Sequence, residues 1–373
     1  MFNSYSIQYY FLISHSFAIL LLFILYYCNK KDKLIFTFLI VLFISFMTGF
    51  RDISIGYDSR TYIEEYISEG SISQNLEIGF KLYNYLCRSF KLAPIIYQFI
   101  NSLIINLLIF VFFIKISDYY PILFALYLSS NIYFIMHLNL VREAISIGLA
   151  LNAINCLFDK KLPLFLILSA AAISFHTSAL FILASCLIGN YIIRDDIINY
   201  NIGRKYIFLI ILLIALKSYL YEIINCIALS IGAGRFRFIA YIIDSSKIGG
   251  LGFFKPWHIA GLFMLTYYIA INHSYYSCII KAGKLNFMIK IYYSGYILFI
   301  LSSINMLVGD RLFYYFYFIG YWLIVNLIQF IKEKDIFILL LLAFTLLWYY
   351  KTIMLQYPNW FIPPYPNMTA PLR

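Results

Sequence analysis

The residues best suited to chemistry stand close together in one short stretch, residues 50–66, directly after an apolar run. It contains two arginines, two aspartates and two glutamates, namely Arg51, Asp52, Asp58, Arg60, Glu64 and Glu65. Charge beside a hydrocarbon segment is costly, so such a cluster is by default a hypothesis of a functional site. The alternative interpretation is a solvated surface loop.

Arg142 is the second feature, because it opens an otherwise apolar run in the segment Asn139-Leu-Val-Arg-Glu-Ala. At the N-terminal end of a helix the backbone dipole adds to its positive potential. A guanidinium binds phosphate oxygens in pairs and stays charged when partly buried. The pattern predicts a site for a diphosphate or another large anion. The alternative is an ion pair with Glu143 or with a carboxylate of a neighbouring helix.

His176 and Asp58 are the candidates for proton transfer. His176, in Ser-Phe-His-Thr-Ser, stands at a predicted helix start. It is either a base or hydrogen-bond donor to a substrate hydroxyl, or a hydrogen-bonded structural histidine. Asp58 follows the turn-forming Gly56. It is a turn residue, the ion-pair partner of Arg60, or a carboxylate that accepts a proton from an attacking hydroxyl.

Several other kinds of chemistry find no support in the sequence. There is no P-loop, dinucleotide fingerprint, zinc-ligand spacing or nucleophile elbow, so we expect no cofactor and no metal. The six cysteines show no CxxC spacing, which argues against a disulfide framework. The net charge is +11. Because the basic residues lie in short clusters between apolar runs and form no basic arm, we expect no nucleic-acid partner.

The composition is that of an integral membrane protein. Hydrophobic residues make up 63% of the chain and charged residues 12%, with a mean hydropathy of +0.84, against roughly 25% charged residues in soluble domains. A span needs about 20 apolar residues, so 373 residues suit a bundle of many helices. We therefore predict an all-α polytopic membrane protein with about 12 transmembrane helices, the first apolar run being a retained span.

Twelve spans result if the apolar run at residues 162–193 is divided at Ser174-Phe-His176. The runs cover about residues 7–27, 34–50, 94–114, 120–136, 138–158, 162–175, 177–193, 206–227, 257–271, 287–308, 312–331 and 336–350. This division collects lysine-rich turns on alternate connections, which the positive-inside rule assigns to the cytoplasm. Every candidate functional group then lies on the outer face. One long span would instead place His176 at the bilayer centre.

We predict a single transmembrane domain, residues 1–373, with three outer segments. Residues 51–93 form the longest connection, whose second half predicts an amphipathic helix lying in the membrane interface. Residues 228–256 hold a Gly-rich loop with Arg235 and Arg237 that suits a lid. The tail, residues 351–373, is Pro-rich and extended. Arg311 begins a late span much as Arg142 does, with Asp310 as its local partner.

Taken in order, these motifs resemble the EpsG-type branch of the Wzy-like polysaccharide polymerases. The matching positions are Arg51 with Gly56-Tyr-Asp58 and Tyr62, Glu77-Ile-Gly-Phe80, Asn139 with Arg142-Glu143-Ala144, Phe175-His176 with Ser178-Ala179, Arg311 with Tyr314, and the C-terminal Pro-Pro-Tyr. Their order extends over nearly the whole chain.

The resemblance implies a glycosyltransferase of the multi-span GT-C type in the bacterial inner membrane, with its active site facing the periplasm. Such a polymerase moves a growing glycan from undecaprenyl diphosphate to the non-reducing end of the next lipid-linked repeat unit. It serves O-antigen, and thus lipopolysaccharide, or exopolysaccharide assembly. The implied partners are the undecaprenyl-diphosphate-linked oligosaccharide and membrane lipids, with a chain-length regulator and a flippase as further candidates.

Under this resemblance, Asp58, His176 and Arg142 are the catalytic candidates. Contacts to the diphosphate or the substrate are expected from Arg51, Arg60, Tyr62, Glu77, Asn139, Glu143, Arg235, Arg237, Arg311 and Tyr314. We expect the guanidinium groups to converge in one outer pocket. Competing interpretations are an O-antigen ligase that uses the same donor, a flippase or transporter for lipid-linked oligosaccharide, and a receptor or scaffold without chemistry. A transporter would distribute charge through its spans and show repeated hydropathy.

Overall fold

In the computed structural model of this chain, the described residues are 4–53, 55, 56, 58–68, 76–187, 212, 282–302, 306–329 and 331–356. Every regular element in these ranges is a helix, and no strand occurs among them. The all-α expectation is thus confirmed for this part of the chain. The expected spans at 206–227 and 257–271, the loop at 228–256 and most of the tail lie outside the described residues.

Five helices within the described ranges are long and apolar enough to cross a membrane. They comprise Gln8–Tyr27, Lys30–Gly49, Pro94–Ile116, Val141–Phe158 and Lys334–Met354. A sixth is obtained if the bent pair Tyr120–Ser129 and Asn131–Asn139 counts as one span. The chain therefore has the character of a multi-span membrane protein, while the count of twelve and the GT-C fold stay predictions.

Contacts divide the chain into two compact units, Met1–Ala179 with Ile328–Arg373, and Leu180–Leu327. The first unit contains α1 (Ser4–Ile24), η1 (Leu25–Tyr27), α2 (Lys30–Gly49), α3 (Ser59–Ile67), α4 (Ile78–Ser89), α5 (Pro94–Ile116), α6 (Tyr120–Ser129), α7 (Asn131–Phe134), η2 (Ile135–Asn139), α8 (Val141–Phe158), α9 (Leu162–Phe175), α16 (Lys334–Lys351) and η8 (Thr352–Gln356). The second contains most of α10 (Ala179–Leu187), then α14 (Ala282–Ser302) and α15 (Met306–Asn326), with η7 (Leu327–Gln329) at the boundary.

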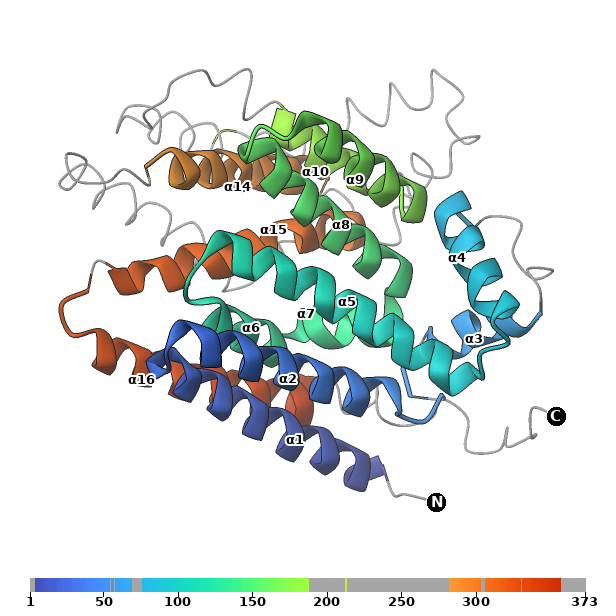
Figure 1. The fold of residues 1–373 in the computed structure, drawn as a ribbon, viewed down its shortest axis with the longest axis horizontal. Coiled ribbons are helices and arrows are strands. Elements are labelled where there is room, and N and C mark those ends of the chain that lie inside the picture. Colours follow the sequence, from blue (N-terminus) through green and yellow to red (C-terminus); the bar gives the residue numbers. More distant parts are fainter. Residues whose placement is uncertain are drawn as a thin grey trace. The chain divides into compact units, whose positions relative to one another are not determined.

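The long helices of the first unit alternate in direction, so their ends form two groups (Figure 1). Ser45, near the end of α2, accepts a hydrogen bond from Asn106 of α5, and Ser146, near the start of α8, donates one to the Ala172 carbonyl near the end of α9. The end of α2, the starts of α5 and α8 and the end of α9 therefore lie together, on the side of α3 and α4. We call this the arginine end.

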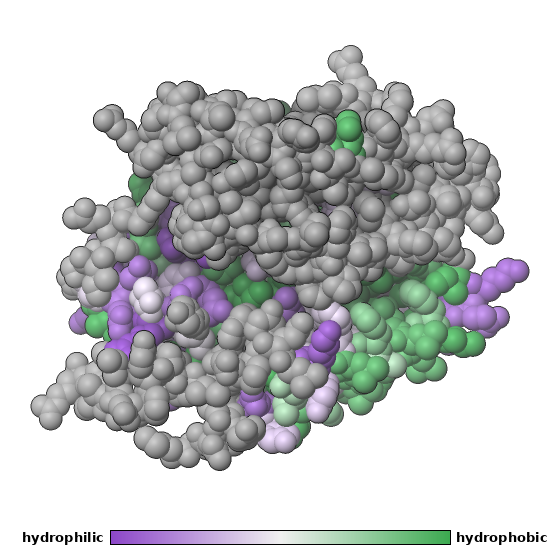
Figure 2. Space-filling model, turned by 180° about the vertical axis from the view of Figure 1, so that it is seen from behind, coloured by the Kyte–Doolittle hydropathy of each residue, from purple (hydrophilic) through white to green (hydrophobic). Residues whose placement is uncertain are grey.

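The lysine-rich connections lie at the opposite ends of these helices, before α2, after α5 and between α8 and α9. Seen from behind, hydrophilic side chains gather on the left, hydrophobic ones extend to their right, and a second hydrophilic group lies at the far right (Figure 2). The alternation inferred from the basic residues is thus present in this unit. Which end faces the cytoplasm follows from the positive-inside rule and stays a prediction.

The amphipathic helix expected in the second half of residues 51–93 is α4. One side of it carries exposed apolar residues, namely Ile78, Leu82, Tyr85 and Leu86, with Phe90 just beyond its end. Its other side buries Phe80, Asn84 and Cys87. The stacked rings of Tyr66 in α3 and Tyr97 in α5, 4.1 Å between centroids, pack with Cys87 in a small core. This core attaches α3 and α4 to the start of α5.

A break between helices occurs at the predicted division, while the assignment of two separate spans there stays a prediction. α9 ends at Phe175 and α10 begins at Ala179. His176 is the C-cap of α9, in an extended conformation, and its backbone N–H donates to the Ala172 carbonyl. The imidazole therefore lies at the end of α9 and not within the helix.

Arg51 secures the chain that leads into α8. The helix pair Tyr120–Ser129 and Asn131–Asn139, made of α6, α7 and η2, is bent by 72°. The carbonyls of His137 and Leu138 close to its end accept hydrogen bonds from residues of the loop and helix after α2. Arg51 Nη2 donates to the His137 carbonyl at 2.9 Å, and Ser59 Oγ donates to the Leu138 carbonyl at 2.8 Å. Arg51 Nη1 also donates to the Thr48 carbonyl. Burial lowers the pKa of Arg51 to about 10, so its side chain stays cationic near neutral pH.

Gly56 fits between this loop and the bent span. Its φ is +104°, a conformation that L side chains rarely adopt, and an added Cβ would lie 2.7 Å from the Leu138 carbonyl oxygen. We expect Gly56→Ala to lower the free energy of unfolding by about 1–3 kcal/mol, measured by thermal unfolding of the purified protein in detergent. An unchanged melting temperature would contradict the described backbone at this position.

Candidate functional site

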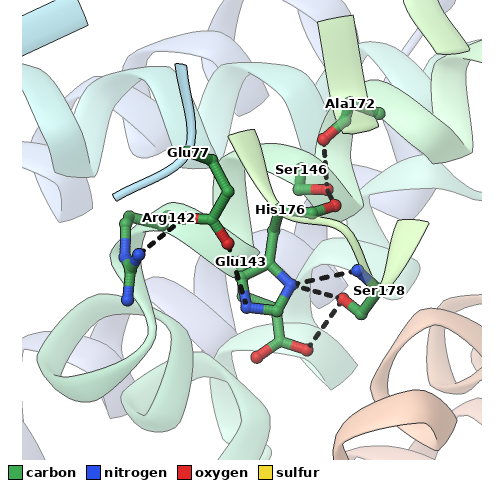
Figure 3. Close-up of polar contacts among 7 residues, drawn as sticks. All are labelled: Glu77, Arg142, Glu143, Ser146, Ala172, His176 and Ser178. Carbon is green, nitrogen blue, oxygen red and sulfur yellow. Dashed lines mark hydrogen bonds and ion pairs between the residues drawn. The ribbon is translucent and has the colours of Figure 1, made fainter. Parts of the chain in front are cut away.

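Charged side chains from three parts of the first unit meet at the arginine end (Figure 3). Glu77 is the residue before α4, Arg142 and Glu143 lie in the first turn of α8, and His176 follows α9. They are distant in sequence, and the packing of α4 and α8 against α9 brings them together. We call Glu77, Arg142, Glu143 and His176, with Ser178, the Glu77 cluster.

Glu77 lies between two basic groups. Its Oε2 is 2.6 Å from Arg142 Nη1, and its Oε1 is 4.0 Å from His176 Nε2. The three side chains are 19%, 26% and 20% exposed, so they are accessible from outside yet partly desolvated. The guanidinium binds Oε2 of Glu77, which leaves Oε1 beside the imidazole.

The orientation of His176 is fixed by the turn that follows it. The backbone N–H of Ser178 donates to His176 Nδ1 at 3.3 Å, and Ser178 Oγ lies 2.6 Å from the same nitrogen. Because a backbone N–H can only donate, Nδ1 is an acceptor. A neutral His176 therefore carries its proton on Nε2, the nitrogen that faces Glu77.

Two serines connect the helices and the turn that carry the cluster. Ser146 Oγ donates to the Ala172 carbonyl at 2.8 Å, which joins α8 to the last turn of α9. Ser178 Oγ is also 3.4 Å from Glu143 Oε1. The first two turns of α8 are thus linked to the end of α9 and to the segment that follows it.

Aromatic rings of α3 and α4 line Arg142. The guanidinium carbon lies 5.9 Å from the centre of the Tyr62 ring and 5.8 Å from that of Phe80, within range of cation–π attraction. Burial raises the pKa of Tyr62 to about 12, Arg142 opposes this rise, and Asp58 and Glu143 add to it. Tyr62 is therefore a neutral phenol and a possible donor.

Glu65 is a second carboxylate, after Glu77, that acts on Arg142. It lies on α3 three residues after Tyr62, which places both on one face of the helix. Its side chain is buried, and it interacts electrostatically with Arg142. Within the described ranges, no group of three His, Cys, Asp or Glu side chains is arranged to hold a metal ion.

A glycine permits the approach of Glu77 to His176. Gly79, in the first turn of α4, lies directly against Ser174 in the last turn of α9, and an added Cβ would be 2.8 Å from the Ser174 carbonyl oxygen. Any larger residue must push α4 away from α9. The spacing between Glu77 and His176 therefore depends on the fact that Gly79 has no side chain.

We expect Gly79→Ala to reduce activity more than it reduces folded protein. Overpacking of this kind costs about 1–3 kcal/mol of stability, while the displaced carboxylate no longer faces the imidazole. Product formed per amount of folded protein measures the effect. Gly79→Ala combined with Ser174→Gly should recover part of the loss, because the hydroxyl is removed but the carbonyl remains. Full activity of Gly79→Ala alone would contradict this role.

The family model named EpsG family matches residues 34–366, which include all of the Glu77 cluster. The chain belongs to the EpsG family. This membership indicates a membrane protein of the polysaccharide polymerase kind, in a family associated with glycosyltransferase-like polymerases. Neither the comparison of this EpsG protein with curated proteins nor that with solved structures finds a match.

The other arginines that were expected at the site of this EpsG protein do not lie in the Glu77 cluster. Arg51 is buried, with four hydrogen bonds to backbone carbonyls and Ser59. Arg60 pairs with Glu64 along the exposed side of α3. Arg51, Arg60 and Arg142 thus each have their own partners, which corrects the expectation of a shared arginine pocket in the first unit.

The remaining candidates are distributed as follows. Asp58 is the N-cap residue of α3 without a side-chain capping hydrogen bond, and Asn139 ends η2 just before α8. Arg311, which is exposed, and Tyr314 belong to α15 in the second unit. Arg235 and Arg237 lie outside the described residues.

No role for Glu65 was predicted from the sequence of this EpsG protein, and Ser178 was noted only as a position of the family motif. A usable signal was present for Glu65, because Tyr62 belongs to the family motif and Glu65 follows it by three residues in a predicted helix. For Ser178, the spacing His-x-Ser was visible, but its bond to the imidazole depends on the turn after α9.

Proposed function

We propose that this EpsG-family protein is a polysaccharide polymerase. It transfers a growing glycan from a polyprenyl diphosphate, undecaprenyl diphosphate in bacteria, to the non-reducing end of a lipid-linked repeat unit on the periplasmic face of the inner membrane. The observation that supports this best is the carboxylate of Glu77, placed beside His176 Nε2 and fixed by Arg142 at the end opposite the lysines. Family membership supports the same class of reaction.

The gap beside Glu77 suits one hydroxyl group. Oε1 of Glu77 and Nε2 of His176 are 4.0 Å apart, so one oxygen can be within hydrogen-bonding distance of both, about 2.6–3.2 Å. A hydroxyl there donates its proton to Glu77 and accepts the N–H of His176. In this proposal Glu77 is the general base, and His176 orients the acceptor hydroxyl.

The reaction then proceeds by displacement at the anomeric carbon of the donor. The acceptor oxygen forms a new bond to that carbon, and its proton passes to Glu77. The bond from the anomeric carbon to the diphosphate oxygen breaks, and the diphosphate leaves with the electron pair. Arg142 holds the Glu77 carboxylate in position until the proton is transferred, through the contact of its Nη1 with Oε2.

The leaving diphosphate requires positive charge from elsewhere in the chain. Arg142 is already bound to Glu77, and Arg51 to backbone carbonyls. Arg311, Arg235 and Arg237 are therefore the remaining candidates of the arginine set for neutralising the diphosphate. Preorganised charge at a leaving group is often the largest catalytic contribution.

Reconstitution with a single substrate tests the function. Purified protein in lipid nanodiscs is incubated with undecaprenyl-diphosphate-linked repeat units and no other acceptor, and the products are separated by gel electrophoresis. A ladder of lengthened glycans that is absent with Glu77→Gln supports the polymerase. No lengthening with native repeat units, together with transfer to added lipid A core, would instead identify a ligase.

A further inference from the structure

A groove of about 320 Å³ lies between α1 and α2, which run side by side (Figure 1). All the described residues that line it are apolar. They include Phe17, Leu21 and Ile24 from α1, and Phe36, Leu39 and Phe43 from α2. A polar group placed in this groove would lose its hydrogen bonds to water without replacement, so a fitting occupant is apolar.

The groove has a closed floor and an open side. Ala18 and Ile40 line it and are buried, whereas Phe17, Phe36 and Leu39 are each more than half exposed. Both helices are long and apolar enough to cross a membrane, so the open side faces hydrocarbon. Side chains normally pack with few voids larger than a water molecule. A hydrocarbon chain in the groove would supply the contacts that its walls lack.

The position of the groove restricts it to one end of the two helices. On α2 it extends over the seven positions from Phe36 to Phe43, which is about 10 Å at 1.5 Å per residue. On the other side it reaches Ile24, the last residue of α1, and Leu25 in η1. It therefore lies next to the lysine-rich connection before α2, at the end opposite the Glu77 cluster.

Lys33 adjoins the groove at that end. It stands three positions before Phe36 and seven before Ile40, which places it on the helix face that lines the groove. Its Nζ lies 5.7 Å from the centre of the Tyr26 ring, and Tyr26 directly follows Leu25. The ammonium group is thus held over η1, where the apolar lining ends.

Positive charge prevails beside this end of the groove. Residues 30–33 hold three lysines and Asp32, a net charge of +2. The Asp32 carboxylate accepts a hydrogen bond from the Asn29 side chain. In the part of the chain that the structure describes, none of these lysines forms an ion pair with an acid. Residues 332–335, which the bond from Tyr27 to Asp335 joins to this connection, add two lysines and two acids and thus no net charge.

We propose that the groove between α1 and α2 binds one acyl chain of an anionic phospholipid, whose phosphate lies against Lys30 and Lys33. The apolar lining accommodates the chain, and Lys30 is the neighbour of Lys33 one helical turn away. Clusters of lysine beside a membrane span attract anionic headgroups. This inference does not depend on the proposed function, because the groove and the Glu77 cluster lie at opposite ends of the first unit.

Native mass spectrometry of the full-length protein in detergent tests the site. Phosphatidylglycerol and phosphatidylcholine with the same acyl chains are titrated separately, and the fraction of protein that retains one lipid gives the affinity. We expect phosphatidylglycerol to bind more tightly. Each lysine beside an anionic headgroup contributes about fivefold in affinity. The double variant Lys30→Gln with Lys33→Gln should therefore lose about thirtyfold for phosphatidylglycerol and little for phosphatidylcholine.

Lys160→Gln with Lys161→Gln is the matched control. It removes the same charge from the connection between α8 and α9, at the same end of the unit, and these helices do not line the groove. Its affinity for phosphatidylglycerol should equal that of the unmodified protein. Equal losses in the two double variants would show general attraction to the lysine-rich end, and would overturn the proposal.

Ala18→Leu tests the place of the acyl chain, because the added carbons fill the floor of the groove. A folded Ala18→Leu protein should lose the tight phosphatidylglycerol although all its lysines remain. Unchanged affinity in that protein would overturn the proposal. The lysine variants change only exposed or half-exposed side chains, so their comparison decides the matter even where Ala18→Leu fails to fold.

Two other occupants would be recognised in the same spectra. Undecaprenyl phosphate that binds more tightly than phosphatidylglycerol, and is lost in Ala18→Leu, would assign the groove to a polyprenyl chain. A dimer that forms only as the lipid is expelled, and is absent in Ala18→Leu, would assign it to a second copy of the chain. Either result would overturn the proposal.

Discussion

Replacing Glu77 by glutamine is expected to reduce polymer formation by about 10²–10⁴-fold, the usual contribution of a general base. The amide keeps the size of the side chain but does not accept a proton. The initial rate of lengthening of lipid-linked repeats, per amount of folded protein in nanodiscs, measures the effect. Glu64→Gln, thirteen positions earlier on α3, should retain the unmodified rate.

A charge exchange separates the chemical role of Glu77 from a purely structural one. In the double variant Glu77→Arg with Arg142→Glu, the ion pair observed at 2.6 Å can form again with its charges reversed. If the pair only joins α4 to α8, both stability and activity should return. We expect stability to return in part and activity to stay lost, because an arginine beside His176 accepts no proton. A double variant with the unmodified rate would refute the role of Glu77 as the base.

Replacement of Arg51 is expected to have the largest effect on stability. Arg51→Met leaves buried oxygens of Thr48, Ile55 and His137 without their donor, and each unsatisfied buried group costs about 1–3 kcal/mol. Together these losses are comparable with the whole stability of many domains, about 5–15 kcal/mol. We expect little folded protein on size-exclusion chromatography in detergent.

Arg51→Lys distinguishes this clamp from a phosphate-binding role. A single lysine ammonium cannot reach all the carbonyls that the planar guanidinium binds. The lysine variant should therefore also lose stability. Arg60→Ala is the comparison for stability, because its exposed pair with Glu64 contributes only about 0.3–0.5 kcal/mol. A lysine variant that folds normally but binds the lipid diphosphate more weakly would show that Arg51 contacts phosphate.

Much of the first unit could be predicted from the sequence, because its signals are local. Long apolar runs indicated the spans, the distribution of lysines indicated their alternation, and spaced apolar residues indicated α4. The break at His176 followed from the same charge argument. In each case the information lies within one helix or its two ends.

The partners of the charged residues could not be predicted in the same way. The sequence showed that Arg51 was unusual, but one of its partners is the carbonyl of His137, which lies near the end of η2 and is 86 positions away along the chain. Arg142 and Glu77 are separated by 65 positions, and their pairing depends on the contact between Gly79 and Ser174. Composition indicates how many charges are present, whereas packing decides which of them meet.

The exposed apolar side of α4 has a consequence for the chemistry. Glu77 directly precedes this helix, whose outward residues Ile78, Leu82 and Tyr85 are more than half exposed and suit the boundary between headgroups and acyl chains. Lipid pressing on that side would hold α4 against α9, so the surrounding bilayer would support the position of Glu77, the proposed base. The proposed polymer formation should therefore respond to headgroup composition and acyl length, and detergent that strips the annular lipid should slow it before the protein unfolds.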